Sequence, residues 1–194
     1  MERTFYHFTH RQNLEGILAA GVLQAARPIL KGKPEDLAVS LTTDPDHTGH
    51  GLPDGRKITA AEAVLLRYYT DDNGAYRCVD NTEFRLELKL LPSPALKPAE
   101  SMHSKRDLLG LAIAGYLPCS PQPTDIEFRD VLGALQTQRL KNKAPTWWYH
   151  FGDLPLTSYS VHHKNKAGGY DLLAKDKLGQ VDLSAIPLQP ILSL

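Results

Sequence analysis

The sequence lacks several features that would place it in a specialised class of protein. Only two cysteines, Cys78 and Cys119, occur in 194 residues, which excludes a disulfide framework and a cysteine-built zinc site. No run of about 18 apolar residues is present, so we expect no contact with a membrane. Charge of one sign is not in excess, because 22 basic residues balance 22 acidic ones. This balance argues against a protein whose affinity rests mainly on phosphate neutralisation.

Common catalytic signatures are also missing. The sequence has no P-loop, GxGxxG, HExxH, GxSxG or CxxC pattern, which excludes P-loop phosphoryl transfer and hydride transfer on a Rossmann fold. The first residues lack the apolar stretch of a signal peptide, so we expect a cytoplasmic protein unless another system exports it. With 42% hydrophobic residues the chain can bury a core, and we expect one domain over residues 1–194.

The N-terminal segment predicts a strand that runs directly into a helix. Residues 4–8 are aromatic-rich and indicate a strand, and apolar residues then recur at helical spacing over residues 10–20. Thr9 and Gln12 have the spacing of a capping box, and Gly21 is placed for a left-handed C-cap. We therefore expect a short amphipathic helix packed behind the first strand.

The rest of the chain mixes helices and strands. Residues 83–91 alternate between apolar and charged side chains, which predicts a half-buried strand. The other expected elements are strands over 37–42 and 146–151, helices over 107–114 and 126–140, a long loop over 44–57, a helix or strand over 61–69 and a turn over 71–74. Because no regular βαβ alternation is present, the fold class is predicted to be α+β.

The opening motif carries a family resemblance. Residues 6–10 read Tyr-His-Phe-Thr-His, and the pattern Asn-Leu-x-x-Ile-Leu-x-x-Gly follows. This segment resembles the first motif of ADP-ribosyltransferase-fold proteins. It is similar to that of DarT-like DNA ADP-ribosyltransferases and to an uncharacterised bacterial family with a Phe-Tyr-His-Phe-Thr opening. The resemblance covers residues 5–23 well and residues 37–90 in order and character.

This resemblance implies an ADP-ribosyltransferase-like fold, in which two small β-sheets with flanking helices form a cleft for NAD, the co-substrate. His7 matches the histidine that hydrogen-bonds the NAD ribose, and Thr9 matches the small hydroxyl residue beside it. Ser40 and Thr42 resemble the Ser/Thr-rich second motif of the arginine-specific branch. These residues are therefore expected to bind NAD.

Glu83 resembles the catalytic glutamate of the third motif, and Glu87 is the alternative carboxylate. Cleavage of the nicotinamide–ribose bond passes through an oxocarbenium-like state, which a carboxylate at the ribose stabilises. Aromatic side chains are expected to stack on the rings of NAD; the candidates are Tyr6, Tyr69, Trp147 and Trp148.

The resemblance implies an NAD-dependent ADP-ribosyltransferase that modifies a macromolecular acceptor, protein or nucleic acid, in a toxin or phage-defence role, with an antitoxin or immunity protein as a further partner. The alternative is a catalytically inactive module on the same fold that binds a nucleotide or nucleic acid. The opening also resembles the Tyr-His-Gly-Thr start of poly-ADP-ribose polymerase-like enzymes, and Phe8 supports this alternative because it replaces the glycine of that motif.

Two further hypotheses remain from the sequence. An RNA 2′-phosphotransferase would need a basic phosphate pocket, for which Arg11, Arg27 and Arg85 are the nearest candidates. His47 and His50 lie near Asp44 and Asp46, but their irregular spacing favours a solvated loop over a metal site.

Basic residues also gather locally. Residues 139–143 and 162–166 are basic stretches expected to be solvated loops. Residues 129–177 hold 8 basic and 4 acidic side chains, the surplus that a nucleic-acid acceptor would need.

Overall fold

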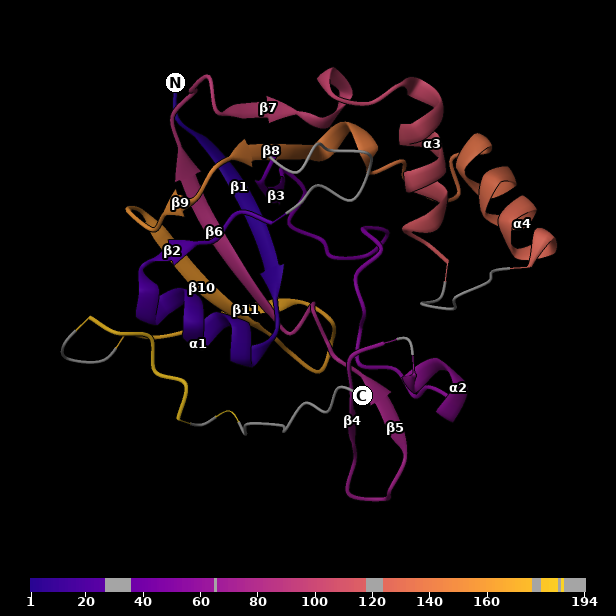
Figure 1. Ribbon diagram of the computed structural model, residues 1–194, viewed down its shortest axis with the longest axis horizontal. Helices are drawn as coiled ribbons and strands as arrows, with labels where there is room; N and C mark the ends of the chain where they lie inside the picture. Colours follow the sequence, from indigo (N-terminus) through magenta and orange to yellow (C-terminus); the bar gives the residue numbers. More distant parts are fainter. Residues whose placement is uncertain (27–35, 65, 118–123, 176–178, 185, 187–194) are drawn as a thin grey trace.

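Strand β1 (Arg3–Thr9) is the central strand of a seven-stranded antiparallel sheet in the computed structural model (Figure 1). The structure describes residues 1–26, 36–64, 66–117, 124–175, 179–184 and 186. The strand order is β11 (Tyr170–Leu172), β10 (Tyr159–Lys164), β6 (Phe84–Leu90), β1, β3 (Ala38–Thr42), β8 (Trp147–Phe151) and β7 (Leu96–Pro98).

Two small sheets and several helices complete the described structure. Strand β2 (Val22–Leu23) pairs with β9 (Leu154–Pro155), and β4 (Tyr68–Thr70) pairs with β5 (Tyr76–Cys78). The helices are α1 (Arg11–Ala20), α2 (Ala60–Ala63), α3 (Lys105–Ala114) and α4 (Asp125–Gln136), with 3-10 turns η1 (Ala99–Ser101) and η2 (Ala144–Thr146). The predicted α+β class is confirmed; where two small sheets were expected around a cleft, seven of the described strands form one large sheet and the other four form two separate pairs.

One face of the large sheet packs against α1. The apolar positions of β6, Phe84, Leu86 and Leu88, are buried there, as their alternation predicted. They form the main core with Phe5 of β1 and Leu14 of α1. This core fixes the end of β1 and the start of α1, where the N-terminal motif lies.

The start of α1 differs from the prediction. Thr9 is the last residue of β1, and His10 takes the N-cap position without a side-chain cap. The predicted Thr9–Gln12 capping box is therefore wrong, because sheet pairing with Phe84 holds Thr9 in β1. The predicted C-cap is confirmed, since Gly21 has φ 65°.

The opposite face of the sheet packs against α3 and η1. Ala38 of β3 and Tyr149 of β8 are buried against Ala99, with Leu108 of α3 beside them. Helix α4 lies next to α3 at the side of the molecule (Figure 1). Within the described parts of the chain, no helix combines the length and the apolar character that a membrane crossing requires.

Several local predictions are confirmed and one is wrong. The strands over 37–42 and 146–151 and the helices over 107–114 and 126–140 correspond to β3, β8, α3 and α4. Residues 61–69 contain both the end of α2 and the start of β4. Residues 162–164 belong to β10 and not to a loop, because they pair with β6 and β11. Arg27 and Cys119 lie outside the described residues.

Candidate functional site

The central sheet separates between β1 and β3. Strand β1 pairs with β6 from Arg3 to Thr9, whereas Tyr6–Thr42 is the one register pair between β1 and β3 in the described structure. The His7 imidazole spans the separation, and its Nδ1 lies 3.0 Å from the Ser40 carbonyl oxygen. Since a carbonyl oxygen only accepts hydrogen bonds, Nδ1 carries the proton and donates it.

A cavity of about 300 Å³ lies at this separation, and we call it the aromatic cleft. Strands β1, β3 and β8 form its floor, and α3 and the loop after β3 border it. The described residues that line it are Tyr6, His7, Phe8, Ser40, Leu41, Thr42, His50, Gly51, Leu52, Leu111, Ala114, Gly115, Trp147, Trp148 and Tyr149. Aromatic and aliphatic side chains with a few polar groups are typical of small-molecule sites.

Four of the five predicted NAD-binding residues border the aromatic cleft. Tyr6, His7, Ser40 and Thr42 are among its lining residues. Thr9 is 3% exposed and is not among them.

These four residues differ in what they offer a ligand. The Ser40 side chain is exposed, whereas the Thr42 hydroxyl accepts a hydrogen bond from the Asp44 amide at 3.0 Å and contacts Thr146 Oγ1 at 2.9 Å. Burial lowers the pKa of His7, against the opposing effect of the Ser40 carbonyl. The imidazole is therefore neutral at physiological pH, and Nε2 is an acceptor for a ligand hydroxyl.

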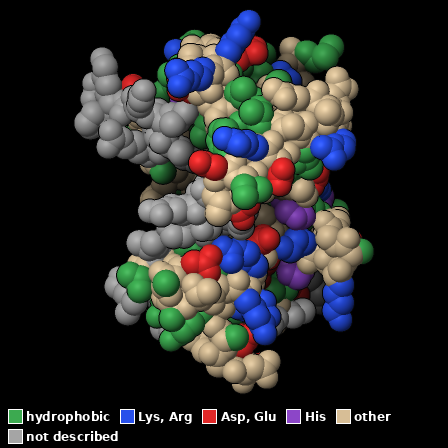
Figure 2. Space-filling view, turned by 90° about the vertical axis from the view of Figure 1, so that its right-hand side faces the viewer, with side chains coloured by type: hydrophobic (Ala, Val, Ile, Leu, Met, Phe, Trp, Pro, Cys, Tyr) green, Lys and Arg blue, Asp and Glu red, His purple; other side chains and the backbone are tan. Residues whose placement is uncertain are grey.

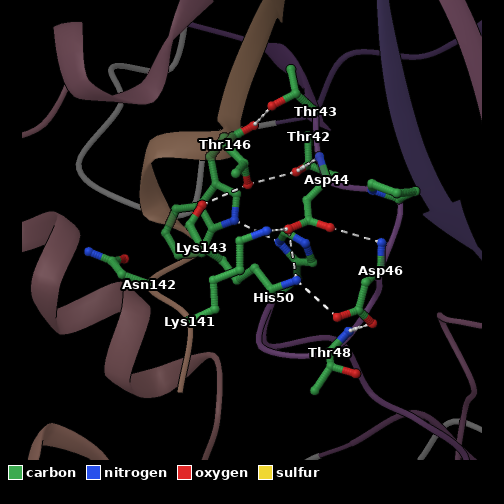
Figure 3. Close-up of polar contacts among 12 residues, drawn as sticks. Thr42, Thr43, Asp44, Asp46, Thr48, His50, Lys141, Asn142, Lys143 and Thr146 are labelled. Atoms are coloured by element: carbon green, nitrogen blue, oxygen red, sulfur yellow. Dashed lines mark hydrogen bonds and ion pairs between the residues drawn. The ribbon is translucent and has the colours of Figure 1, made fainter. Parts of the chain in front are cut away.

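A buried ion-pair network holds the loop that borders the cleft (Figure 3). Lys143 Nζ lies 2.9 Å from Asp44 Oδ2 and 3.0 Å from Asp46 Oδ2, and Lys141 Nζ lies 2.8 Å from Asp44 Oδ2. Burial opposes ionisation of Asp44, but the hydrogen bonds from Lys141 and Lys143 outweigh it and lower the pKa of Asp44. Lys143 is 2% exposed and so departs from the expectation that residues 139–143 form a solvated loop, whereas Arg139, Lys141 and Asn142 are exposed as expected.

The same loop carries His50 into contact with Trp147. Trp147 Nε1 donates a 2.7 Å hydrogen bond to His50 Nδ1, and Phe8 lies beside the imidazole with 5.9 Å between ring centroids. Burial lowers the pKa of His50 to about 4, so the ring is neutral. In the described residues no group of three histidine, cysteine or acidic residues is arranged to hold a metal ion.

Two further cavities lie near the aromatic cleft. The central cavity, about 370 Å³, shares Gly51, Leu52 and Gly115 with it. A smaller polar cavity of about 210 Å³ shares Asp54 with the central cavity. The polar cavity is lined by His10, Arg11, Gln12, Asp54, Gly55, Tyr69, Val79, Asp80 and Glu83.

Glu83 lies at the end of this series, in the polar cavity, and not in the aromatic cleft. Its Oε2 accepts a 3.0 Å hydrogen bond from the Arg11 amide, so Glu83 supplies the cap that α1 lacks locally. Burial raises the pKa of Glu83, against the opposing effect of this hydrogen bond. Among the described residues, Oε1 has no hydrogen-bond partner.

The other candidates lie at separate positions. Glu87 pairs with Tyr6 across β1 and β6, and its Oε2 lies 3.6 Å from His162 Nε2. Tyr69 borders the polar cavity. Trp148 packs edge-on against Phe5 at 5.5 Å, so the two tryptophans serve opposite faces of the sheet.

Sequence reasoning did not find the cleft residues at the end of α3, because their pattern is that of an ordinary amphipathic helix. These residues are Leu111 and Ala114 of α3 and Gly115, which follows it.

Compared with known proteins, the chain matches no family model, no curated protein and no solved structure.

Proposed function

We propose that the chain is an NAD-dependent ADP-ribosyltransferase with an ADP-ribosyltransferase-like fold. The observation that carries the proposal is the aromatic cleft, which brings Tyr6, His7, Ser40 and Thr42 together at the separation of β1 and β3. These residues come from two segments that the resemblance pairs in one NAD site. Their convergence on one cavity is not required by their spacing in the sequence.

The shape of the cavities supports an extended ligand. The aromatic cleft, the central cavity and the polar cavity follow one another through shared lining residues. A dinucleotide needs an elongated site with surfaces for flat rings, and Trp147, Tyr149 and Phe8 supply aromatic surface at one end. Gly51 lies where the first two cavities meet and has φ 71°.

The chemistry of the lining residues supports the same proposal. The His7 Nε2 and the exposed Ser40 hydroxyl are suited to hold ribose hydroxyl groups. Glu83 borders the polar cavity and not the aromatic cleft, so NAD must extend through the central cavity to the edge of the polar cavity for the Glu83 Oε1 to stabilise positive charge on the reacting ribose and accept the proton of an acceptor.

An inactive binding module is the second candidate, and the position of Glu83 favours it. Its Oε2 already caps α1, so Glu83 has a structural role in the fold that does not depend on catalysis. The two candidates make the same prediction for NAD binding and opposite predictions for turnover.

The test measures NAD binding by calorimetry and NAD consumption in the presence of cell lysate. We expect the wild type to bind and consume NAD, and Glu83→Gln to bind it but to consume it at least a hundredfold more slowly. Glu87→Gln tests the alternative carboxylate, and Glu100→Gln, at an exposed site outside the three cavities, is the matched control. Binding without turnover in the wild type would establish the inactive module, and absence of NAD binding would reject the enzyme and a module whose nucleotide is NAD.

A further inference from the structure

The polar cavity contains a buried histidine whose hydrogen bonds are unaccounted for. His10 is 3% exposed, and neither imidazole nitrogen has a hydrogen-bond partner in the described structure. Buried polar groups in folded proteins nearly always have partners, because an unpaired group loses its hydration without compensation. His10 borders the polar cavity, so a ligand in this cavity is the natural partner for the imidazole.

His10 and Glu83 lie at the same end of the central strands. The last register pair of β1 and β6 is Thr9–Phe84, so the chain leaves the sheet through His10 on one strand and enters it from Glu83 on the other. Both residues border the polar cavity, whose volume of about 210 Å³ lies below the range of sites for drug-sized ligands. The cavity therefore suits a single side chain or a small polar group.

The charges around the cavity favour a group with N–H donors. Asp54, Asp80 and Glu83 border it with carboxylates, whereas the Arg11 guanidinium is engaged by Glu15 at 2.8 Å and by the Ile186 carbonyl. An anionic ligand would meet the carboxylates of Asp54 and Glu83 at close range, while Lys164 pairs with Asp80 and Arg67 places a positive charge near His10. A nitrogen that donates hydrogen bonds would instead find several acceptors.

The lysines near the cavities are already paired with carboxylates and so are not free to bind phosphate groups. Lys141 and Lys143 pair with Asp44, and Lys164 pairs with Asp80. The local basic surplus of residues 129–177 is therefore partly neutralised by carboxylates from residues 44–80. On the face shown in Figure 2, the described acidic and basic side chains are interleaved. This distribution favours a polypeptide over a nucleic acid as the acceptor.

We propose that the polar cavity receives the acceptor, a nitrogen-bearing side chain of a polypeptide, and that His10 holds it beside Glu83. This inference rests on the proposed function. In the transfer, the acceptor nitrogen supplies the electron pair for the new bond to the ribose carbon. The pair of the broken glycosidic bond leaves with nicotinamide, and the proton lost by the acceptor nitrogen goes to Glu83.

The protonation state of His10 agrees with this role. Burial and the nearby Arg67 lower the pKa of His10 to about 4. A neutral imidazole offers one donor and one acceptor and does not repel a cationic side chain. Burial raises the pKa of the Glu83 carboxyl, which makes it a better proton acceptor.

The experiment compares His10→Phe, which removes both nitrogens, with His10→Gln, which keeps a donor and an acceptor. His150→Phe is the matched control, since His150 borders none of the three cavities. Each purified protein is incubated with lysate and NAD labelled in the adenylate phosphate, and the product is digested separately with protease and nuclease. NAD affinity and the thermal midpoint are measured for every variant.

We expect the wild type to place the label on protein, and His10→Phe to lose at least tenfold in transfer while NAD affinity changes by less than twofold. His10→Gln is expected to recover part of the transfer. Should the folded His10→Phe variant transfer like the wild type, or nuclease release the label, this inference is overturned while the proposed function stands. A wild type that consumes no NAD overturns both.

Discussion

Lys143 Nζ contacts Asp44 Oδ2 at 2.9 Å, and the two side chains are only 2% and 6% exposed. They are 99 residues apart in the sequence, and their contact joins the loop after β3 to the segment before β8. Thr42 lies two residues before Asp44 and Trp147 lies four residues after Lys143, and both border the aromatic cleft. The ion pair therefore connects the stability of the fold to the shape of the candidate site.

Removal of one partner is expected to be costly. Lys143→Met leaves Asp44 buried with only the exposed Lys141 as a counter-ion, so we expect a loss of about 3–5 kcal/mol in the free energy of unfolding. Lys141→Met is the control; its side chain is 68% exposed, and we expect a loss of less than about 1 kcal/mol. Urea unfolding of both variants measures the difference, and equal losses would contradict a special role for Lys143.

Acid should weaken the protein through the same carboxylate. Because the folded state lowers the pKa of Asp44 below its unfolded value of about 3.9, this group stabilises the fold above that pH. The contribution is lost as the pH falls below about 4 and Asp44 takes up a proton. We expect wild-type stability to decline over this range and Asp44→Asn to show a shallower decline, measured by urea unfolding between pH 3 and 7. Parallel curves for the two proteins would rule out Asp44 as the source.

The sequence predicted the local elements around the site better than the contacts between them. The strand-helix opening and the alternation of β6 depend on residues close in the chain, and both are present in the structure. The Asp44–Lys143 pair and the pairing of β10 with β6 join distant segments, and periodicity carries no information about such partners. Thr9 shows the same limit, since its capping pattern is correct locally but sheet pairing decides its role.

Gly115 should be sensitive to a single added methyl group. It ends α3 where the helix meets the loop, and a Cβ there would lie 2.3 Å from the Gly49 carbonyl oxygen. Since that atom belongs to the backbone, the loop would have to move, and we expect Gly115→Ala to lower stability by about 1–3 kcal/mol and to weaken NAD binding. Gly110→Ala is the control in the same helix, where a Cβ meets nothing within 4 Å. We expect that change to stabilise the protein by about 0.5–1 kcal/mol, because alanine favours the helix. Thermal unfolding and calorimetry separate the two, and similar effects would show that the close approach to Gly49 is unimportant.

The adjacent tryptophans should have separable roles. Both tryptophans border the aromatic cleft, but Trp147 donates a hydrogen bond to His50, whereas the ring of Trp148 packs against Phe5 with the Arg3 guanidinium 4.7 Å from its centroid. Stacking of a base on an aromatic side chain contributes about 1–3 kcal/mol, so we expect Trp147→Ala to weaken NAD binding at least tenfold.

Trp148→Ala instead removes packing from the main core, and we expect it to cost about 3–5 kcal/mol of stability. Its effect on NAD affinity should be smaller than that of Trp147→Ala when binding is measured at a temperature where the variant is folded. Calorimetric titration and urea unfolding of both variants provide the comparison. If Trp148→Ala lost NAD affinity while Trp147→Ala kept it, the assignment of Trp147 as the stacking surface would be wrong.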